Sequence, residues 1–204
     1  VRQGTKSLPH HFKSLGYRVA LIGKTHFKPA SSFPFEMLRG KEASDTAKIS
    51  EFVNRDKEQP YCLVVASKQP HSPWTLGPQQ KYDPAKLTIP PYLEDTPATR
   101  ETLAKYYAEI EYLDGQVGAC MNIVEKSGQV DDTIFAFTSE QGSALPFAKW
   151  TCYDLGLKTG LIVRWPGHIE AGSENSAMVQ YVDVLPTLLE AAGAVPRKVD
   201  TGRP

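Results

Sequence analysis

The sequence predicts an α/β fold with a mostly parallel central sheet and helices on both faces. Short apolar runs alternate with longer segments in which apolar residues recur every three or four positions. The runs at 17–23 and 61–67 are nearly continuous in apolar residues, as expected for strands buried on both faces. Strands connected through helices pair in parallel, because a parallel connection needs a crossover that is usually a helix.

The first third of the chain predicts the order helix, strand, helix. Residues 7–16 carry three apolar side chains at helical spacing, and a glycine ends the pattern. The strand at 17–23 follows directly. Residues 44–59 predict a second helix, with Ser44 or Asp45 as its N-terminal cap.

The rest of the chain continues the alternation. A strand at 61–67 leads into a proline-rich stretch at 68–97, which we interpret as a long loop, and loops of that length inside a domain are usually functional or disordered. Residues 99–128 predict the longest helix, whose apolar residues form a core face. The remaining predicted elements are strands at 132–139 and 160–166 and a helix at 182–193.

Composition limits the classes of function. The 204 residues are enough for one sizeable core, and 23 basic residues balance 23 acidic ones. No global field therefore favours nucleic acid or an anionic membrane, and no apolar stretch approaches the roughly 20 residues of a membrane span. The chain opens without an initiator methionine, so we expect an N-terminus upstream.

The three cysteines fit no zinc or redox motif. Cys62 and Cys120 lie in apolar patterns, which favours small core residues over a chemical role. For Cys152 the pattern is less decisive, but an unreactive thiol is favoured there too, since a reactive thiol needs an electropositive setting.

Polar side chains follow three of the predicted strands, where each strand ends. In open α/β sheets, ligands bind outside the carboxyl ends of the strands, and parallel strands bring those ends to one edge. We therefore expect these side chains to converge. They are Lys24, His26, His71, Glu140, Gln141 and Lys149.

This set suits a divalent hard cation next to an anionic substrate. Carboxylate and amide oxygens bind such a metal, while lysines and histidines neutralise the anion and act as acid or base. Taken singly, each piece has a plainer interpretation as solvated surface or an ordinary turn. The convergence of three strand ends is what favours a site.

The motifs that carry these residues resemble those of the sulfatase family, in the family's order. They are LGYRVALIGKTHF, QPHSPW, TSEQG followed by AKWTCYD, and VRWPG with VDVLPTLLEAAG. The resemblance implies the alkaline-phosphatase-like α/β fold and hydrolysis of sulfate esters or N-sulfates, including those of sulfated sugars. It also implies a calcium ion and a formylglycine nucleophile made from Cys or Ser.

The resemblance also implies roles for individual residues. Lys24 and His26 would hold the substrate sulfate and the hydroxyl of the nucleophile. His71 would contact the sulfate and assist the leaving group, and Lys149 would be a second lysine on the sulfate. Glu140 and Gln141 would fall at a pair of calcium ligands.

The chain departs from the family pattern in two respects. Glu140 and Gln141 stand where the family usually has Asp and then Asn or His, so both side chains are one methylene longer. The nucleophile motif, Cys or Ser followed by x-Pro-x-Arg, occurs nowhere in these residues, and the first pair of metal-binding aspartates should lie upstream. We therefore expect residues 1–204 to be a partial catalytic domain, truncated at both ends, without turnover of its own and with open sheet edges.

Two alternatives stay open at this point. One is a phosphodiesterase or phosphomonoesterase of the alkaline-phosphatase superfamily, and the other is a non-catalytic anion-binding fragment. The sequence leaves the sugar, the linkage and the oligomeric state undetermined. It also leaves the compartment open, although the resemblance is compatible with a periplasmic, secreted or lysosomal protein.

Overall fold

The computed structural model describes residues 1–2, 4–39 and 43–194. All of the predicted helices and strands are present. The elements are α1 (Leu8–Ser14), β1 (Arg18–Gly23), β2 (Glu36–Met37), α2 (Thr46–Asn54), β3 (Tyr61–Ala66), α3 (Pro97–Ser127), β4 (Phe135–Thr138), α4 (Asp154–Leu157), β5 (Leu161–Arg164) and α5 (Tyr181–Ala191), with short 3-10 turns η1 (Ala30–Ser32), η2 (Gln79–Lys81) and η3 (Pro84–Lys86). The strand β2, the helix α4 and the three turns were not predicted, because two to four residues are too few to show a period.

The strands form two sheets. The first has the order β2-β1-β3 and is parallel throughout, with Arg18 opposite Tyr61 and Gly23 opposite Ala66. The second pairs β4 with β5 in the antiparallel sense. The prediction of a mostly parallel sheet is thus confirmed, and the antiparallel pair of β4 and β5 is the exception. The connection from β4 to β5 holds only the four-residue α4, which is too short to serve as a helical crossover.

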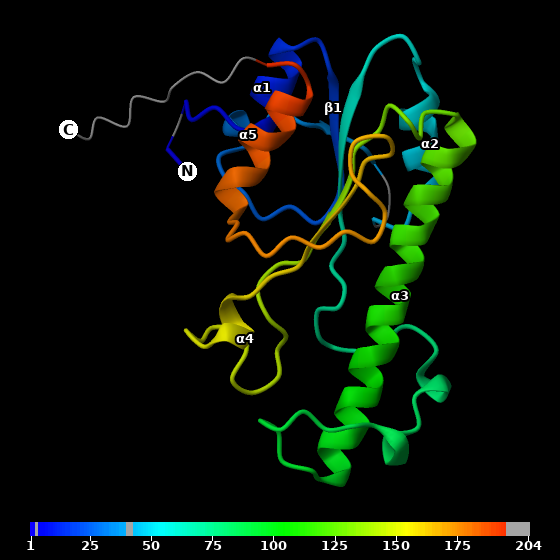
Figure 1. Cartoon of the computed structure of the whole chain (residues 1–204), viewed down its shortest axis with the longest axis vertical. Coiled ribbons are helices and arrows are strands. Elements are labelled where there is room, and N and C mark those ends of the chain that lie inside the picture. The colour runs from blue at the N-terminus through cyan, green and yellow to red at the C-terminus, as the bar shows by residue number, and fades with distance from the viewer. Residues whose placement is uncertain (3, 40–42, 195–204) are drawn as a thin grey trace, which may run out of the picture.

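Helices cover the parallel sheet from two sides, with α1 and α5 on one side of β1 and α2 and α3 on the other (Figure 1). The main core lies under α2 and α3, where Ile22 of β1 packs with Ile49 and Val53 of α2 and Ile123 of α3. The side chain of Phe135 in β4 packs against the same cluster. Within the described residues, no helix combines the length and the apolar character needed to cross a membrane.

Burial differs between the two long parallel strands, although their sequences are similarly apolar. The four central residues of β1 are fully buried, whereas every residue of β3 is partly exposed. The cause is pairing: β1 has a partner on each edge, while β3 pairs only with β1 among the described strands. The outer edges of β3 and β4 are thus open, and such edges are available to another strand.

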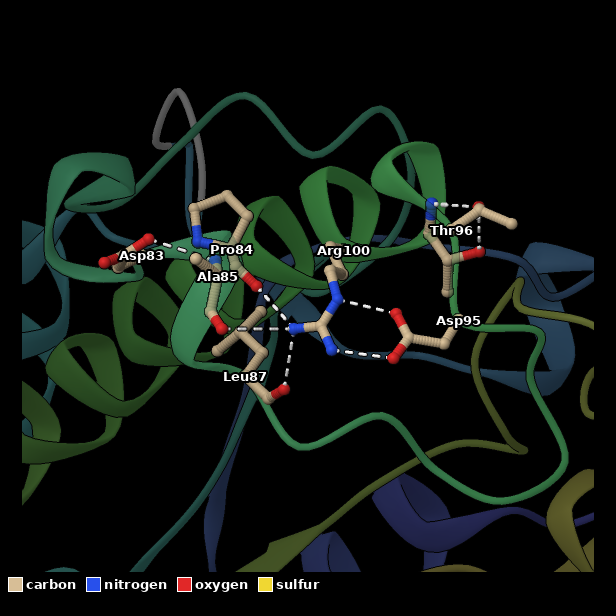
Figure 2. Close-up of polar contacts among 8 residues, drawn as sticks. Asp83, Pro84, Ala85, Leu87, Asp95, Thr96 and Arg100 are labelled. Carbon is tan, nitrogen blue, oxygen red and sulfur yellow. Dashed lines mark hydrogen bonds and ion pairs between the residues drawn. The ribbon is translucent and has the colours of Figure 1, made fainter.

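The long segment between β3 and α3 is fastened to the first turns of α3 (Figure 2). The guanidinium of Arg100 forms a bidentate ion pair with Asp95, with Nε 2.6 Å from Oδ1 and Nη2 2.7 Å from Oδ2. Its remaining nitrogen donates to the backbone carbonyls of Pro84, Ala85 and Leu87. Thr96 caps the helix by accepting from the amide of Thr99 at 3.1 Å. The segment is therefore an ordered loop.

Candidate active site

The ends of β1 and β3 lie side by side at one edge of the parallel sheet. The amide of Lys24 donates to the carbonyl of Ala66 at 2.8 Å, which extends the ladder one residue past β1. Gly23 has a φ of +100°, and a Cβ at this position would lie 2.3 Å from the same carbonyl oxygen. Only glycine fits such a close approach of two backbones. The sequence thus sends Lys24 out of the sheet directly next to the exit of β3.

The end of β4 reaches the same place. The ammonium of Lys24 lies 3.4 Å from a carboxylate oxygen of Glu140, 116 residues further along the chain. The side chain of Lys24 is 24% exposed and that of Glu140 is 67% exposed. A long, single contact of this kind is weak, so each partner stays available to a ligand of opposite charge.

Loops from β3 and β4 also meet on α3. The ring of Trp74, in the loop after β3, lies 5.2 Å from that of Tyr106 on α3, and its Nε1 donates to the carbonyl of Pro70 at 3.0 Å. Burial raises the pKa of the Tyr106 hydroxyl, and the nearby hydroxyl of Ser143, in the loop after β4, opposes that shift. Tyr106 is thus the point on the helix that both loops share.

A buried carboxylate anchors the loop that carries His71. Glu109 of α3 is 1% exposed, and its Oε2 accepts from the amide of Leu76 at 2.7 Å. The next residue, Gly77, has a φ of +78° and passes so close to α3 that a Cβ would lie 1.9 Å from the carbonyl oxygen of Ala108. The role of Glu109 was not predicted from the sequence, because a glutamate on a long helix normally lies in water.

His71 is exposed at the tip of this loop. Its amide donates to the carbonyl of Lys68 at 3.0 Å, and its Nδ1 lies 2.6 Å from the carbonyl oxygen of Ser72. A carbonyl can only accept, so this contact places a proton on Nδ1 and leaves Nε2 free. The free nitrogen can exchange a proton with a substrate.

The other predicted residues lie on the same loops without touching the Lys24–Glu140 pair. His26 is exposed, two residues after Lys24. Gln141 is partly buried beside Glu140. Lys149 is partly buried, and its amide donates to the carbonyl of Ser143 at 2.9 Å. Within the described residues, no hydrogen bond or ion pair joins His26, His71 or Lys149 to that pair.

Comparison with known families identifies the family of the chain. The family model described as Sulfatase matches residues 39–194, more than three quarters of the chain. The chain belongs to the sulfatase family. The match includes the loops after β3 and β4, so the resemblance inferred from the motifs is confirmed.

Sulfatases of known activity are similar over nearly the whole chain. An ulvan-active sulfatase of Formosa agariphila is 30% identical over 94% of this chain and 39% of its own length. The human N-sulphoglucosamine sulphohydrolase is 27% identical over 91% of this chain and 44% of its own length. The chain thus spans about two fifths of the length of these curated relatives.

Solved structures confirm the fold class. The structure of a protein in complex with its substrate, D-glucosamine-2-N,6-O-disulfate, matches with a TM-score of 0.73 at 21% identity, over 96% of this chain and 63% of that chain. A structure with bound neocarrahexaose matches with a TM-score of 0.70 at 19% identity, over 94% of this chain and 54% of that chain. The α/β, alkaline-phosphatase-like fold that the motifs implied is therefore the fold of this chain.

Sulfatases generally use a divalent cation. Among the described residues, no group of three or more His, Cys, Asp or Glu side chains is arranged to hold a metal. Glu140 and Gln141 are oxygen donors of the type that hard cations prefer. Their chemistry therefore fits such an ion.

Proposed function

We propose that the protein is a sulfuric ester hydrolase that removes sulfate from sulfated carbohydrates, as an ester or an N-sulfate. The observation that carries this proposal is the contact between Lys24 and Glu140 at 3.4 Å. It supports the proposal because it joins an ammonium that could bind an anion to a carboxylate that could bind a metal, in a chain of the sulfatase family. In such a site the lysine and the metal ion that the carboxylate would hold both face the negative charge of the ester.

The class of substrate is inferred from the relatives. Their names specify ulvan, N-sulphoglucosamine and N-acetylglucosamine sulfates, and one structural neighbour was solved with a glucosamine disulfate. All of these are sulfated sugars or their polymers. We therefore assign the sulfated sugar as the substrate and leave open which linkage is cleaved.

The proposed side chains have two roles, which are binding of the sulfate charge and donation of a proton. Lys24, His26 and Lys149 neutralise the sulfate oxygens, on which charge accumulates as the bond to the sugar breaks. His71 holds its Nδ1 proton against the carbonyl of Ser72. In the imidazolium form its Nε2 also carries a proton, which it would donate to the departing oxygen or nitrogen. The nucleophile is not assigned to any of these 204 residues.

Glu140 and Gln141 would hold the cation, which we propose is calcium. When bound, calcium supplies positive charge opposite the sulfate oxygens, and it takes six to eight oxygen ligands in flexible geometry. That flexibility accommodates side chains one methylene longer than the family usually has. The exposed ion pair with Lys24 is of a kind that contributes only about 0 to 1 kcal/mol, so a sulfate can replace it on the lysine.

Sulfate release by the full-length protein tests the proposal. We expect release from N-acetylglucosamine 6-sulfate or N-sulfoglucosamine, loss of activity with a chelator, and recovery with calcium. Glu140→Ala should weaken the recovery by calcium without changing the thermal midpoint. Faster hydrolysis of the corresponding phosphate esters would instead favour a phosphatase of the same superfamily, and binding without hydrolysis of either would favour an anion-binding module.

A further inference from the structure

We propose that the aromatic side chains of Trp150, Phe147 and Tyr153 form a platform on which a sugar ring of the substrate stacks, beside the sulfate that Lys149 binds. We call these three residues the aromatic platform. The inference rests on the proposed function, because it assigns a sugar-binding role to the loop that carries Lys149. It adds a binding surface to that site.

The first observation is exposure. Trp150 is 91% exposed, Tyr153 is 62% exposed and Phe147 is 53% exposed. Tryptophan side chains are highly buried on average, so a nearly fully exposed indole is unusual. The rings of Phe147 and Tyr153 pack edge to face, with centroids 6.0 Å apart. Three large rings on one short segment thus present their surface to solvent.

The second observation is backbone conformation. Phe147 has a φ of 63° and Trp150 a φ of 68°, which are the only two non-glycine residues with positive φ in the described chain. A bulky residue in this region is a genuine outlier, and such strain concentrates at functional sites. Hydrogen bonds hold the loop in this shape: Thr151 Oγ1 donates to the carbonyl of Ala148 at 2.7 Å, and the amide of Lys149 donates to that of Ser143 at 2.9 Å.

The third observation is that the loop is closely packed beneath the rings. A Cβ on Gly142 would lie 1.7 Å from the carbonyl oxygen of Leu155, and a Cβ on Gly156 would lie 2.5 Å from that of Ala148. Ala148 itself is 3% exposed. The loop therefore cannot relax the strain by a small shift. The backbone that carries the rings is therefore fixed before a ligand arrives, which reduces the entropy lost on binding.

Charge and spacing identify the ligand as a sulfated sugar. The ammonium of Lys149 lies 5.3 Å from the centroid of the Trp150 ring. A sugar ring has a face of C–H bonds that complements the negative face of an indole, and a sulfate on that ring pairs with a lysine. One sulfated ring can contact both side chains at this spacing. Inorganic sulfate would use the lysine alone, and a neutral sugar would use the indole alone.

Binding to the full-length protein, in a His71→Gln background that removes the proposed proton donor, tests the platform. Incorporated 5-fluorotryptophan gives each tryptophan of the protein a ¹⁹F resonance, and Trp150→Phe identifies that of Trp150. The probes are N-acetylglucosamine 6-sulfate, N-acetylglucosamine and inorganic sulfate. Met178→Ala is the matched control, because Met178 is 92% exposed and lies outside the loop.

We expect the sulfated sugar to shift the Trp150 resonance, and Trp150→Ala to raise its Kd at least fivefold while the Kd for inorganic sulfate changes less than twofold. Trp150→Phe should recover part of the affinity, and Met178→Ala should change neither Kd. Equal weakening of both probes would overturn the proposal, because the indole would then only position Lys149. So would an unchanged Kd for the sugar, or a Trp150 resonance that a soluble quencher cannot reach because another protein segment covers it.

The outcome is separable from that of the proposed function. If the protein releases sulfate from sugars and Trp150→Ala leaves kcat/KM unchanged, the platform is wrong and the hydrolase assignment survives. If the platform binds the sulfated sugar and no sulfate is ever released, the platform survives and the hydrolase assignment is wrong.

Discussion

The contact between Gly77 and α3 allows a sharp test of how the His71 loop is held. In Gly77→Ala, the new Cβ would meet the carbonyl oxygen of Ala108 at 1.9 Å, against an ordinary contact of at least 3.4 Å. Because backbone atoms lie on both sides, the loop must lift by about 1.5 Å. The bond from the amide of Leu76 to Glu109, now 2.7 Å, would then exceed the range of a hydrogen bond.

The expected cost has two components. An alanine in the left-handed region costs about 1 to 2 kcal/mol. Loss of a hydrogen bond to a charged group costs about 1.5 to 3 kcal/mol, and here it leaves a buried carboxylate without its donor. A total of about 3 to 5 kcal/mol corresponds to a fall of roughly 10 °C in the melting temperature of a domain of this size. Because the lifted loop carries His71, we also expect kcat/KM of the full-length protein to fall about tenfold or more.

Gly128→Ala is the matched control. Gly128 has a φ of +74°, close to the +78° of Gly77, but a Cβ there would meet nothing within 4 Å. It therefore carries the conformational strain without the clash, and we expect a fall of only about 3 to 6 °C with kcat/KM unchanged. Differential scanning calorimetry and a sulfate-release assay measure both. Equal effects of the two substitutions would refute the reasoning, since the approach to α3 would then carry no cost.

Three further predictions concern side chains at and near the site. His71→Gln in the full-length protein should leave the melting temperature within about 2 °C and lower kcat about 10²-fold, most for poor leaving groups; a lower melting temperature with normal turnover would make His71 structural. Lys24→Ala and Lys149→Ala should each lower kcat/KM by roughly 10²-fold, and a loss below threefold would remove that lysine from the site. Burial raises the pKa of the Cys62 thiol to about 11, so this thiol stays protonated at pH 8. Iodoacetamide should therefore modify the exposed Cys152 far sooner than Cys62, as measured by mass mapping of the labelled peptides. Equal labelling of the two thiols would show that the reagent reaches Cys62 in β3 readily.

Much of the candidate site could be predicted from the sequence, because it depends on where strands end. The run at 17–23 predicts a strand, and the polar residues that follow it must leave the sheet at its carboxyl edge. Lys24 is at that edge, next to the exit of β3, and it meets Glu140 from β4. Whether His26, His71, Gln141 and Lys149 complete a catalytic site stays a prediction for the substitutions and binding measurements proposed for them.

The direction of β5 and the exposure of β3 were not available from local patterns. An apolar run has the same sequence signature whichever way its partner runs, and its burial depends on how many neighbours it has. Pairing with β1 on one edge alone leaves every residue of β3 partly exposed. The open edge of β3 is a property of the assembled sheet.

The amino-acid sequence by itself determined the family, the α/β class and the order of helices and strands, because period and motif are local and need no folded chain. Only the tertiary structure decided that Glu109 is a buried anchor and that Gly77 touches α3. It also decided that the side chain of Trp150 is exposed and that its backbone has a positive φ. These facts depend on contacts between residues far apart in the chain or on a backbone angle that packing imposes. The identity of a residue as glutamate or tryptophan does not by itself predict whether it will be buried or exposed.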